Sequence, residues 1–554
     1  MTTTDPPFDP DALRQRYRVE RDKRIREDGN EQYLEMAGDF AHYLDDPYVQ
    51  PLGRGPLADE VAVAVIGGGF GGLLAGARLR EAGVEDLRII EKGGDFGGTW
   101  YWNRYPGAAC DIESYIYLPL LEEIGFMPKE KYTRAPEILD HSRKVAEHYD
   151  LYRGACFQTE VTAVEWHDAD GRWISAPTAA TPCARHLRRE PHGSGRPARR
   201  HHRHRCHRGA VRAPPGGGGR AAVRVPAHAV VDRRAQRPAH RPRLGGVARA
   251  RLAEAAHGEL QQPRHRHPRA RGPGGRRLDR HHRQAAHPRR PAAVGPSADD
   301  VTTSLELADF DKMEQIRARV DEIVADPTTA EALKPYYRQL CKRPCFHDEY
   351  LDAFNRPNVS LVDTDGRGVE EITERGVVAN GVEYELDCII YATGFEVGTE
   401  YTRRAGYEVV GRDGITLTEK WADGAQTFHG MHSRGFPNCF IVSLIQSGFT
   451  ANFPHMLDEQ SKHLAYILNH ADTHGMTRIE AGQEAEDAWV QTIVGLAQLN
   501  EKFLEACTPG FYNNEGRPAE RSLRNTSYGA GSVAFIKVLE AWRAEATLPG
   551  LELT

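Results

Sequence analysis

Apolar and polar positions divide the chain into two patterned parts that flank a stretch without any period. In the first part, residues 61–66 form a continuous apolar run that predicts a buried strand, followed by a glycine cluster and a helical stretch over 73–82. A second predicted strand covers residues 87–90 and ends at Glu91. A strand, a crossover helix and another strand form a βαβ unit, so this part predicts an α/β fold with a parallel sheet.

Further elements are expected on both sides of this unit. Residues 1–58 carry apolar positions at roughly helical spacing and predict a helical N-terminal extension. A helix is expected over 135–151, and a strand pair over 161–174 around an Asp-Ala-Asp-Gly turn. After residue 299 the pattern resumes and predicts helices over 305–355, 461–468 and 533–543, and strands over 359–362 and 377–395.

Residues 176–290 show neither period. They contain 29 Arg, 14 His and no Lys, and they lack Ile, Phe, Tyr, Trp and Met altogether. Their net charge is +24, whereas the rest of the chain carries −30. A segment of this composition does not bury enough apolar surface to offset the loss of chain entropy, so it is predicted to be disordered.

Three interpretations of this segment are open. It is a nucleic-acid-binding arm, a metal cluster, or the translation of a GC-rich gene in the wrong frame. The arm would lack Lys and stacking aromatics, and the cluster would lack the paired spacing of a zinc site. We favour the wrong frame, because Arg, Ala, Pro, Gly and His codons are what GC-rich DNA yields when it is translated off-frame. The residues of the possible metal cluster are His201, His202, His204, Cys206 and His207.

Length and cysteine usage bound the class of protein. A chain of 554 residues is long enough for two to four compact lobes. Its nine cysteines include no C-x-x-C pair and nothing that resembles a disulfide framework, which favours a reducing, cytoplasmic location. No secretion signal and no apolar stretch of about 18 residues is present, so we expect no membrane contact. We expect no nucleic-acid partner, because the arginine-rich segment 176–290 lacks Lys and stacking aromatics. The sequence does not indicate an oligomeric state.

The glycine cluster has the spacing of a dinucleotide-binding loop. Gly67-x-Gly69-x-x-Gly72 follows a predicted strand and opens a helix, and Glu91 lies at the end of the next strand. The first glycine allows a tight turn, the second lets a pyrophosphate approach the backbone, and the third allows close packing of helix on strand. Glu91 is expected to accept a hydrogen bond from a ribose hydroxyl. The motif therefore predicts dinucleotide binding.

A family resemblance appears in the segment that follows. Residues 97–107, Gly-Gly-Thr-Trp-Tyr-Trp-Asn-Arg-Tyr-Pro-Gly, together with residues 111–114, resemble the flavin-contacting segment of class I Baeyer-Villiger monooxygenases. The N-terminal extension and residues 114–123 and 508–516 resemble the branch of that family that oxidises bulkier cyclic and bicyclic ketones. The likeness covers residues 10–175 and 300–554.

The resemblance implies a fold and a reaction. The fold is a flavoprotein with two dinucleotide-binding domains: an FAD-binding domain in two parts, 59–175 and 386–554, a disrupted NADPH-binding region at 176–299, and a helical region at 300–385. The implied reaction uses FAD and NADPH: the reduced flavin captures dioxygen as a C4a-peroxide, which attacks a ketone and gives a lactone or ester. A fixed cation in a water-poor site is needed for the charges that develop.

The resemblance also implies roles for individual residues. Arg343 matches the catalytic arginine, Asp111 the carboxylate paired with it, and Lys342 a lysine that contacts the 2′-phosphate of NADPH. From the residues alone, Lys342 and Arg343 are equally a solvated surface pair, and Met456, expected near the flavin ring, is equally an ordinary buried methionine. Residues 389–395 resemble the Ala-Thr-Gly motif of two-dinucleotide flavoproteins. The FAD-binding residues implied are Gly67, Gly69, Phe70, Gly72, Glu91, Gly98, Thr99, Trp100, Asp111 and Tyr117.

The chain departs from this family in the NADPH-binding region. An F-x-G-x-x-x-H-x-x-x-W fingerprint and a second G-x-G-x-x-G should lie between about 190 and 240, and neither is present. Two alternatives to a working ketone oxygenase therefore remain. One is a catalytically impaired FAD-binding remnant without a working NADPH site, and the other is a flavin-containing monooxygenase that oxidises heteroatoms.

Overall fold

The computed structural model describes residues 7–33, 44–55, 58–179, 221–222, 298–345, 347–392, 396–497 and 501–554. The fold is α/β, with a Rossmann-like part at the start of the chain, as predicted. Most of the arginine-rich segment, residues 176–290, lies outside the described residues, and so does the prediction that this segment is disordered. Its described residues extend the strand β5 (Arg172–Ala179), which continues past the predicted end at 174, and form the short strand β6 (Ala221–Ala222).

A parallel sheet forms the first part of the fold. Strands β1 (Val63–Ile66), β2 (Leu87–Ile90) and β3 (Ala155–Cys156) lie in that order, and all pairs are parallel. Helix α2 (Phe70–Glu81) crosses between β1 and β2, which confirms the βαβ unit. The prediction of a buried strand over 61–66 was wrong in part: Val63 and Val65 pack against the core, whereas Ala64 and Ile66 are exposed.

The second half of the chain returns to this sheet. Helix α11 (Phe453–Thr473) packs along α2, with Leu457 and Leu464 in the same core cluster as Leu73 and Leu74. Arg78 donates to both carboxylate oxygens of Asp458, from Nε to Oδ1 at 2.7 Å and from Nη2 to Oδ2 at 3.0 Å. A three-stranded sheet of β11 (Glu408–Val410), β4 (Thr159–His167) and β5 likewise combines early and late segments. The hairpin of β4 and β5 confirms the predicted strand pair.

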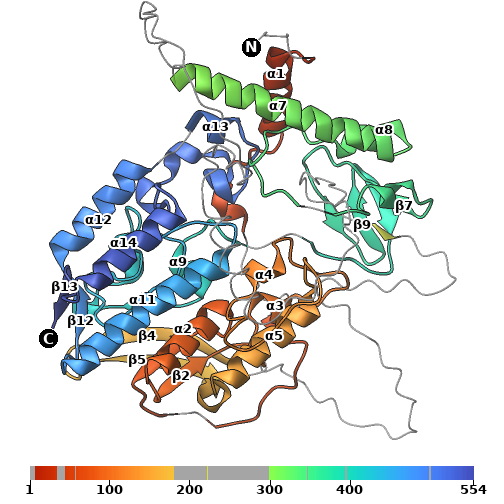
Figure 1. The fold of residues 1–554 in the computed structure, drawn as a ribbon. Coiled ribbons are helices and arrows are strands. Elements are labelled where there is room, and N and C mark those ends of the chain that lie inside the picture. The colour runs from red at the N-terminus through yellow and green to blue at the C-terminus, as the bar shows by residue number, and fades with distance from the viewer. Residues whose placement is uncertain are drawn as a thin grey trace, which may run out of the picture.

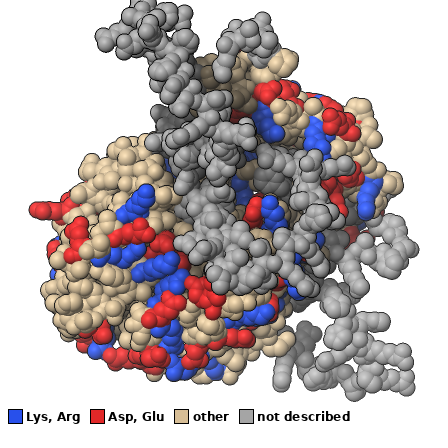
Figure 2. All heavy atoms as spheres, viewed as in Figure 1, with Lys and Arg blue, Asp and Glu red and all other residues tan. Residues whose placement is uncertain are grey.

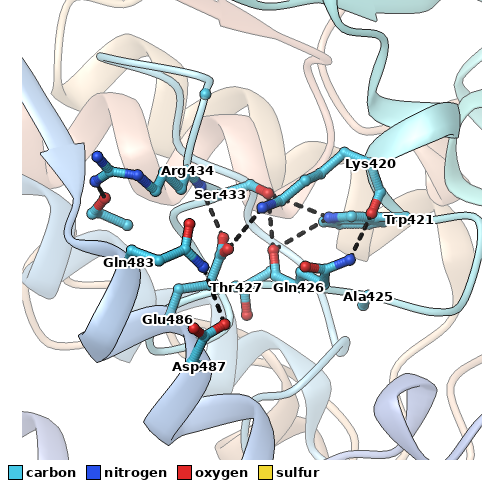
Figure 3. A network of polar contacts seen from close by, with 12 residues as sticks. Lys420, Trp421, Ala425, Gln426, Thr427, Ser433, Arg434, Gln483, Glu486 and Asp487 are labelled. Atoms are coloured by element: carbon cyan, nitrogen blue, oxygen red, sulfur yellow. Dashed lines mark hydrogen bonds and ion pairs between the residues drawn. The ribbon is translucent and has the colours of Figure 1, made fainter.

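A C-terminal core is built around α11. The helices α12 (Gln483–Leu496) and α14 (Ser532–Ala544) and the antiparallel pair β12 (Ile479–Ala481) and β13 (Leu551–Leu553) lie beside it, as Figure 1 shows. A polar network (Figure 3) fastens α12 to the end of α10 (Leu417–Lys420) and to the segment that follows α10. The buried Glu486 carboxylate accepts from Lys420 Nζ and from the Arg434 backbone N–H, both at 2.7 Å. Burial raises the pKa of Glu486, whereas Lys420 lowers it, with a net upward shift.

Helices from two distant parts of the chain form a separate layer. Helix α7 (Ala298–Ile323) runs across α1 (Pro10–Asp22) and is followed by α8 (Pro327–Leu333), at the top of Figure 1. The buried Arg317 joins them, donating to the Tyr17 hydroxyl at 3.0 Å and to the Pro335 carbonyl at 2.6 Å. The predicted N-terminal extension is therefore helical at Pro10–Asp22 and Gly29–Gln32, and the helices predicted over 305–355 are found at Ala298–Ile323 and Pro327–Leu333. The prediction was wrong at residues 45–55, 334–345 and 347–351, which belong to no helix. The shorter elements are α3 (Thr99–Trp102), α4 (Ser114–Tyr117), α5 (Ala135–His148), α9 (Tyr401–Ala405), α10 (Leu417–Lys420), α13 (Glu501–Ala506), η1 (Gly29–Gln32), η6 (Phe511–Gly516), β7 (Val359–Ser360), β8 (Glu371–Ile372), β9 (Gly376–Ala379) and β10 (Val382–Glu385).

Two expectations require correction. Residues 389–392 belong to no strand of the structure, and 393–395, with the Thr and Gly of the Ala-Thr-Gly motif, lie outside the described residues. Cys341 and Cys507 form a disulfide, although the cysteine spacing indicated none. Their separation of 166 residues explains this failure, because only the folded chain brings the two together.

Charged side chains of both signs are mixed on one face of the molecule (Figure 2). On the face shown in Figure 2, acidic and basic side chains are interspersed, and neither sign forms an extended patch among the residues that are coloured. Within the described ranges, no helix combines the length and apolar character that crossing a membrane requires.

Candidate active site

The glycine loop between β1 and α2 has the shape that a pyrophosphate requires. Gly67 has a φ of +104°, and a Cβ built on it would meet nothing within 4 Å, so the space beside it is open. A Cβ on Gly72 would instead lie 1.9 Å from the Gly67 carbonyl oxygen. Helix α2 begins after Gly69 without a side-chain cap, and the first amides of a helix have no partner within it. An anion can therefore be bound there.

Glu91 is built into the same loop. Its buried carboxylate accepts from the backbone N–H groups of Gly68 and Gly93, both at 2.6 Å. Each carboxylate oxygen has a second lone pair, so these bonds leave capacity for a ribose hydroxyl. Glu91 thus stabilises the loop conformation in addition to the ribose contact that the sequence predicted.

A second glycine turn packs against the first. Gly98 has a φ of +50°, and a Cβ on it would lie 2.7 Å from Gly69 Cα, so only glycine fits this close approach. The turn leads into α3, where Thr99 is exposed and Trp100 is buried. Trp100 Nε1 donates to the Tyr117 hydroxyl at 3.0 Å, and the Tyr117 ring meets Phe70 edge to face at 5.7 Å. The structure therefore brings together the FAD-binding residues expected between Gly67 and Tyr117.

Arg343 and Asp111 form an ion pair across 232 positions of the chain. Arg343 Nη2 donates to Asp111 Oδ1 at 2.6 Å, with the two side chains 55% and 27% exposed. Burial lowers the pKa of Arg343 and Asp111 raises it, with a net upward shift. The guanidinium is therefore a permanent cation whose direction is set by one carboxylate. Arg343 remains 55% exposed, so the ion pair with Asp111 is also compatible with the solvated surface position that the residues alone allow, and its catalytic role stays a prediction.

Lys342 does not point freely into solvent. Its Nζ donates to the Pro509 carbonyl at 2.9 Å, and burial lowers its pKa. The neighbouring Cys341 is joined to Cys507. The segment that carries Arg343 is therefore attached at two points to the loop of residues 507–516, which we call the 507–516 loop.

Met456 lies in the C-terminal core. Its side chain is fully buried, and a Cβ on Gly448 would come within 2.8 Å of its methyl carbon. Packing alone accounts for this position, and a contact with the flavin ring stays a prediction. Among the described residues, no group of three or more His, Cys, Asp or Glu side chains has an arrangement that fits a metal ion.

Sequence reasoning missed part of the surroundings of Arg343. Tyr512 and the free thiol of Cys345 both lie within the electrostatic influence of Arg343. Burial raises the pKa of each group and the positive charge of Arg343 lowers it, with a net upward shift in both cases. Tyr512 lies in the 507–516 loop, which the sequence quoted only as a family likeness. No local pattern could have placed this loop beside Arg343, because the contact joins segments far apart in the chain.

Comparisons with known proteins agree with this geometry. Residues 65–124 match the model of the NAD(P)-binding Rossmann-like domain. The chain is similar to a neopentalenolactone D synthase of Streptomyces avermitilis, at 45% identity over 98% of this chain and 99% of that protein. It is also similar to a Baeyer-Villiger monooxygenase of Streptomyces coelicolor, at 40% identity over 96% of this chain and 95% of that one.

Among solved structures, the chain resembles a polycyclic ketone monooxygenase from the fungus Thermothelomyces thermophila. The TM-score is 0.75 at 28% identity, with 98% of this chain and 99% of that chain covered. The alignment with the Streptomyces avermitilis protein has 604 positions, whereas this chain has 554 residues. At least 50 positions of that relative therefore have no counterpart here.

Proposed function

The chain belongs to the Baeyer-Villiger monooxygenases, and from this premise we propose that it oxidises a cyclic or polycyclic ketone to a lactone or ester. The cofactors are FAD and NADPH, and the co-substrate is dioxygen. The observation that carries the proposal for this chain is the Arg343–Asp111 pair, which places an oriented cation on the FAD-binding part of the fold.

The residues present fit the diphosphate of FAD. The open space beside Gly67, the uncapped start of α2 and the close approach of Gly98 to Gly69 leave room for an anion against the backbone. FAD, once reduced by NADPH, supplies the activated oxygen atom that is inserted next to the ketone carbonyl. Trp100, Phe70 and Tyr117 form an aromatic wall that excludes water beside this cradle.

Arg343 is proposed as the catalytic cation. The carbonyl oxygen of the ketone gains negative charge as the new carbon–oxygen bond forms, and a guanidinium held in place stabilises that charge without rearrangement. Asp111 keeps the guanidinium in one orientation through its 2.6 Å hydrogen bond. An adjacent carboxylate also reduces the net charge of the site, so the free site attracts fewer competing anions.

Lys342 is proposed to contact the 2′-phosphate of NADPH. Its ammonium group is already held by the Pro509 carbonyl, which leaves further N–H donors for a phosphate oxygen. Burial lowers the pKa of Lys342, and a bound phosphate would raise it again. NADPH binding should therefore be tighter below the pKa of Lys342 than above it.

An impaired enzyme is the second candidate, and the arginine-rich segment favours it. The Streptomyces avermitilis relative has at least 50 positions that this chain lacks, and neither expected NADPH motif is present at 176–290. A wrong reading frame in this region would leave the FAD cradle intact and remove the partner domain for NADPH. Resequencing the gene across codons 170–300 tests this directly, because an uninterrupted frame that encodes the printed residues would contradict it.

The variant Arg343→Ala tests the proposed function. Holoenzyme with photoreduced flavin is mixed with oxygenated buffer that contains cyclohexanone or norcamphor, so that the assay does not depend on the NADPH-binding region. We expect Arg343→Ala to retain FAD and to lose ester formation by at least about 100-fold. Arg375→Ala, which removes an exposed arginine paired with Glu383, should leave the yield unchanged.

Ester yield from Arg343→Ala equal to that of the wild type would remove Arg343 from the catalytic role. A ketone that carries a sulfide distinguishes the reaction types, because ester formation supports ketone oxidation and sulfoxide as the only product supports heteroatom oxidation. Wild-type protein that binds FAD and forms no oxygenated product from any of these compounds would support the impaired remnant.

A further inference from the structure

The disulfide between Cys341 and Cys507 lies two residues from Arg343. Both cysteines are almost completely buried, with relative exposures of 3% and 1%. They form a small apolar cluster with Tyr337, against which Phe503 packs. A dissolved reductant has little access to a bond in this position, so the disulfide has the character of a permanent link.

The segment that carries Arg343 has few other constraints. Residues 341–344 belong to no helix or strand, since α8 ends at Leu333 and the next short helix begins at Asp352. Three consecutive side chains fix this segment instead: Cys341 to Cys507, Lys342 to the Pro509 carbonyl at 2.9 Å, and Arg343 to Asp111 at 2.6 Å. The first two links lead to the same loop, and the third leads to the FAD-binding part.

The 507–516 loop is a firm anchor. The buried Asn513 amide donates to the carbonyls of Leu504 and Cys507, both at 3.1 Å, and its oxygen accepts from the Gly510 and Gly516 N–H groups at 3.0 and 3.2 Å. A single side chain thereby closes the loop on itself.

The N-terminal segment holds the same loop from outside. The Tyr33 hydroxyl donates to Glu515 Oε1 at 2.8 Å, and Asn30 Nδ2 donates to Asn514 Oδ1 at 2.8 Å. The loop therefore has fixed contacts on two sides, and a covalent bond to it restricts the position of whatever is attached.

We propose that the Cys341–Cys507 disulfide is a positioning element for Arg343 in ketone oxidation. The inference rests on the proposed function of Arg343. With the bond intact, the backbone at residue 341 is fixed, and the guanidinium meets Asp111 and the ketone oxygen from one direction. Without it, the hydrogen bond of Lys342 is the remaining link to the loop, and small displacements of a catalytic group cost large factors in rate.

The first experiment asks whether the bond exists in the purified protein. A peptide map without reduction should join the peptides that contain Cys341 and Cys507, and treatment with a phosphine reductant under denaturing conditions should separate them. Free thiols at both positions in folded holoenzyme would overturn the inference, whatever the activity of the protein.

The second experiment is a double-mutant cycle on the holoenzyme. In the double variant Cys341→Ala/Cys507→Ala we expect FAD to be retained and the ester formed per dioxygen consumed to fall at least about 10-fold, with hydrogen peroxide replacing the lost ester. In the Arg343→Ala background the same cysteine changes should alter this ratio less than about 2-fold, since residues that act as one unit are not additive. Cys439→Ala, which removes a free cysteine in another core cluster, is the matched control.

Three results would overturn the positioning role: an unchanged ester ratio in the cysteine variant, an equal loss in the Arg343→Ala background, or an equal loss in Cys439→Ala. If the double alanine variant is not recovered as folded protein, Cys341→Ser/Cys507→Ser, whose side chains have nearly the size of the thiols, replaces it in the cycle. The same fall in the ester ratio is expected, and an unchanged ratio counts against the role. Wild type that forms no ester contradicts the proposed function itself, whereas a joined peptide pair with an unaffected ratio contradicts only the positioning role.

Discussion

The glycine loop and the surroundings of Arg343 place charged groups for the same reaction, but they are constructed differently. The loop and its support come from one continuous stretch, β1 to α3, and backbone packing determines its shape. Arg343 depends on Asp111, on the 507–516 loop and, through that loop, on the N-terminal segment. The first region is determined by steric exclusion and the second by a few side-chain links between distant segments.

This difference leads to different sensitivities. At Gly72 and Gly98 an added methyl group has no room, so substitutions there are expected to act on folding and FAD binding together. Around Arg343 each link is a single side-chain contact, so substitutions are expected to act on the reaction while the fold persists. The predictions below test this division, in order of decreasing expected effect.

Gly72→Ala should have the largest effect. A Cβ at this position would lie 1.9 Å from the Gly67 carbonyl oxygen, and backbone atoms do not move away cheaply. We expect protein that unfolds at a clearly lower temperature and is purified without FAD, as measured by the ratio of flavin to protein absorbance. Gly83→Ala is the control: its φ of +88° costs about 1 kcal/mol in strain, but a Cβ there meets nothing within 4 Å. Normal FAD content in Gly72→Ala would contradict the steric account of this loop.

Asp111→Asn should act on the reaction and not on the fold. The amide keeps the shape of the carboxylate and removes its charge, so the guanidinium of Arg343 loses its charge-assisted partner. We expect FAD content to be unchanged and ester formation to fall by roughly 10- to 100-fold, about 1.4 to 2.7 kcal/mol in the barrier. Asp365→Asn, which removes an exposed carboxylate paired with Lys23, should leave both unchanged. Loss of FAD from Asp111→Asn would show that the two regions are not separable in this way.

Acid should affect the FAD-binding side first. His429, His432 and His463 are buried in and beside the C-terminal core, and burial lowers the pKa of the first two to about 3 and that of His463 well below its usual value. In the unfolded chain each histidine takes up a proton near pH 6.5, whereas in the folded protein it does not. The contribution of these neutral histidines to the free energy of unfolding is therefore fully present above about pH 6.5. It is lost as the pH falls towards 3, by up to about 1.4 kcal/mol per pH unit for each histidine.

Helix α11 connects this cluster to the glycine loop, because it carries both His463 and the Asp458 that binds Arg78. The increase in flavin fluorescence that reports FAD release should occur over the same pH range as the loss of helical circular dichroism, between pH 6.5 and 4. The Cys341–Cys507 link should persist in a peptide map. His474→Gln, at the exposed end of α11, should leave the pH dependence unchanged. A stability that does not vary with pH over this range would contradict the neutral state of the buried histidines.

Glu486→Gln should have the smallest effect and should leave both regions unaffected. The amide keeps the shape of the side chain and retains an acceptor for the Arg434 N–H, but it loses the charge opposite Lys420. We expect a decrease of about 1 kcal/mol in the free energy of unfolding, because the loss of the charge opposite Lys420 outweighs the relief from burying a carboxylate. FAD content and ester ratio should equal those of the wild type, and a change in either would show that this network is coupled to the active site.

The sequence by itself determined the βαβ unit and the residues that form its loop. Strand, glycine spacing and Glu91 are local features, and the constraint on each glycine comes from atoms within a few residues, such as the Gly67 carbonyl against Gly72. The local pattern also predicted helices over 135–151, 461–468 and 533–543, since a periodic apolar face is visible in any short window. The structure has them at Ala135–His148, Phe453–Thr473 and Ser532–Ala544, so the second prediction found only the middle of its helix. The family likeness selected Arg343 and Asp111, which periodicity alone would have assigned to the surface.

Only the tertiary structure decided what holds Arg343 in place. The bond between Cys341 and Cys507, the contact of Lys342 with the Pro509 carbonyl and the support of the loop by Tyr33 join positions 166 to 482 residues apart. No pattern within a window of the sequence carries such pairings, because they arise when separately formed elements pack and exclude water. The same reason explains why the cysteine spacing indicated no disulfide and why burial of the histidines followed only from the packing of α11, α12 and α14.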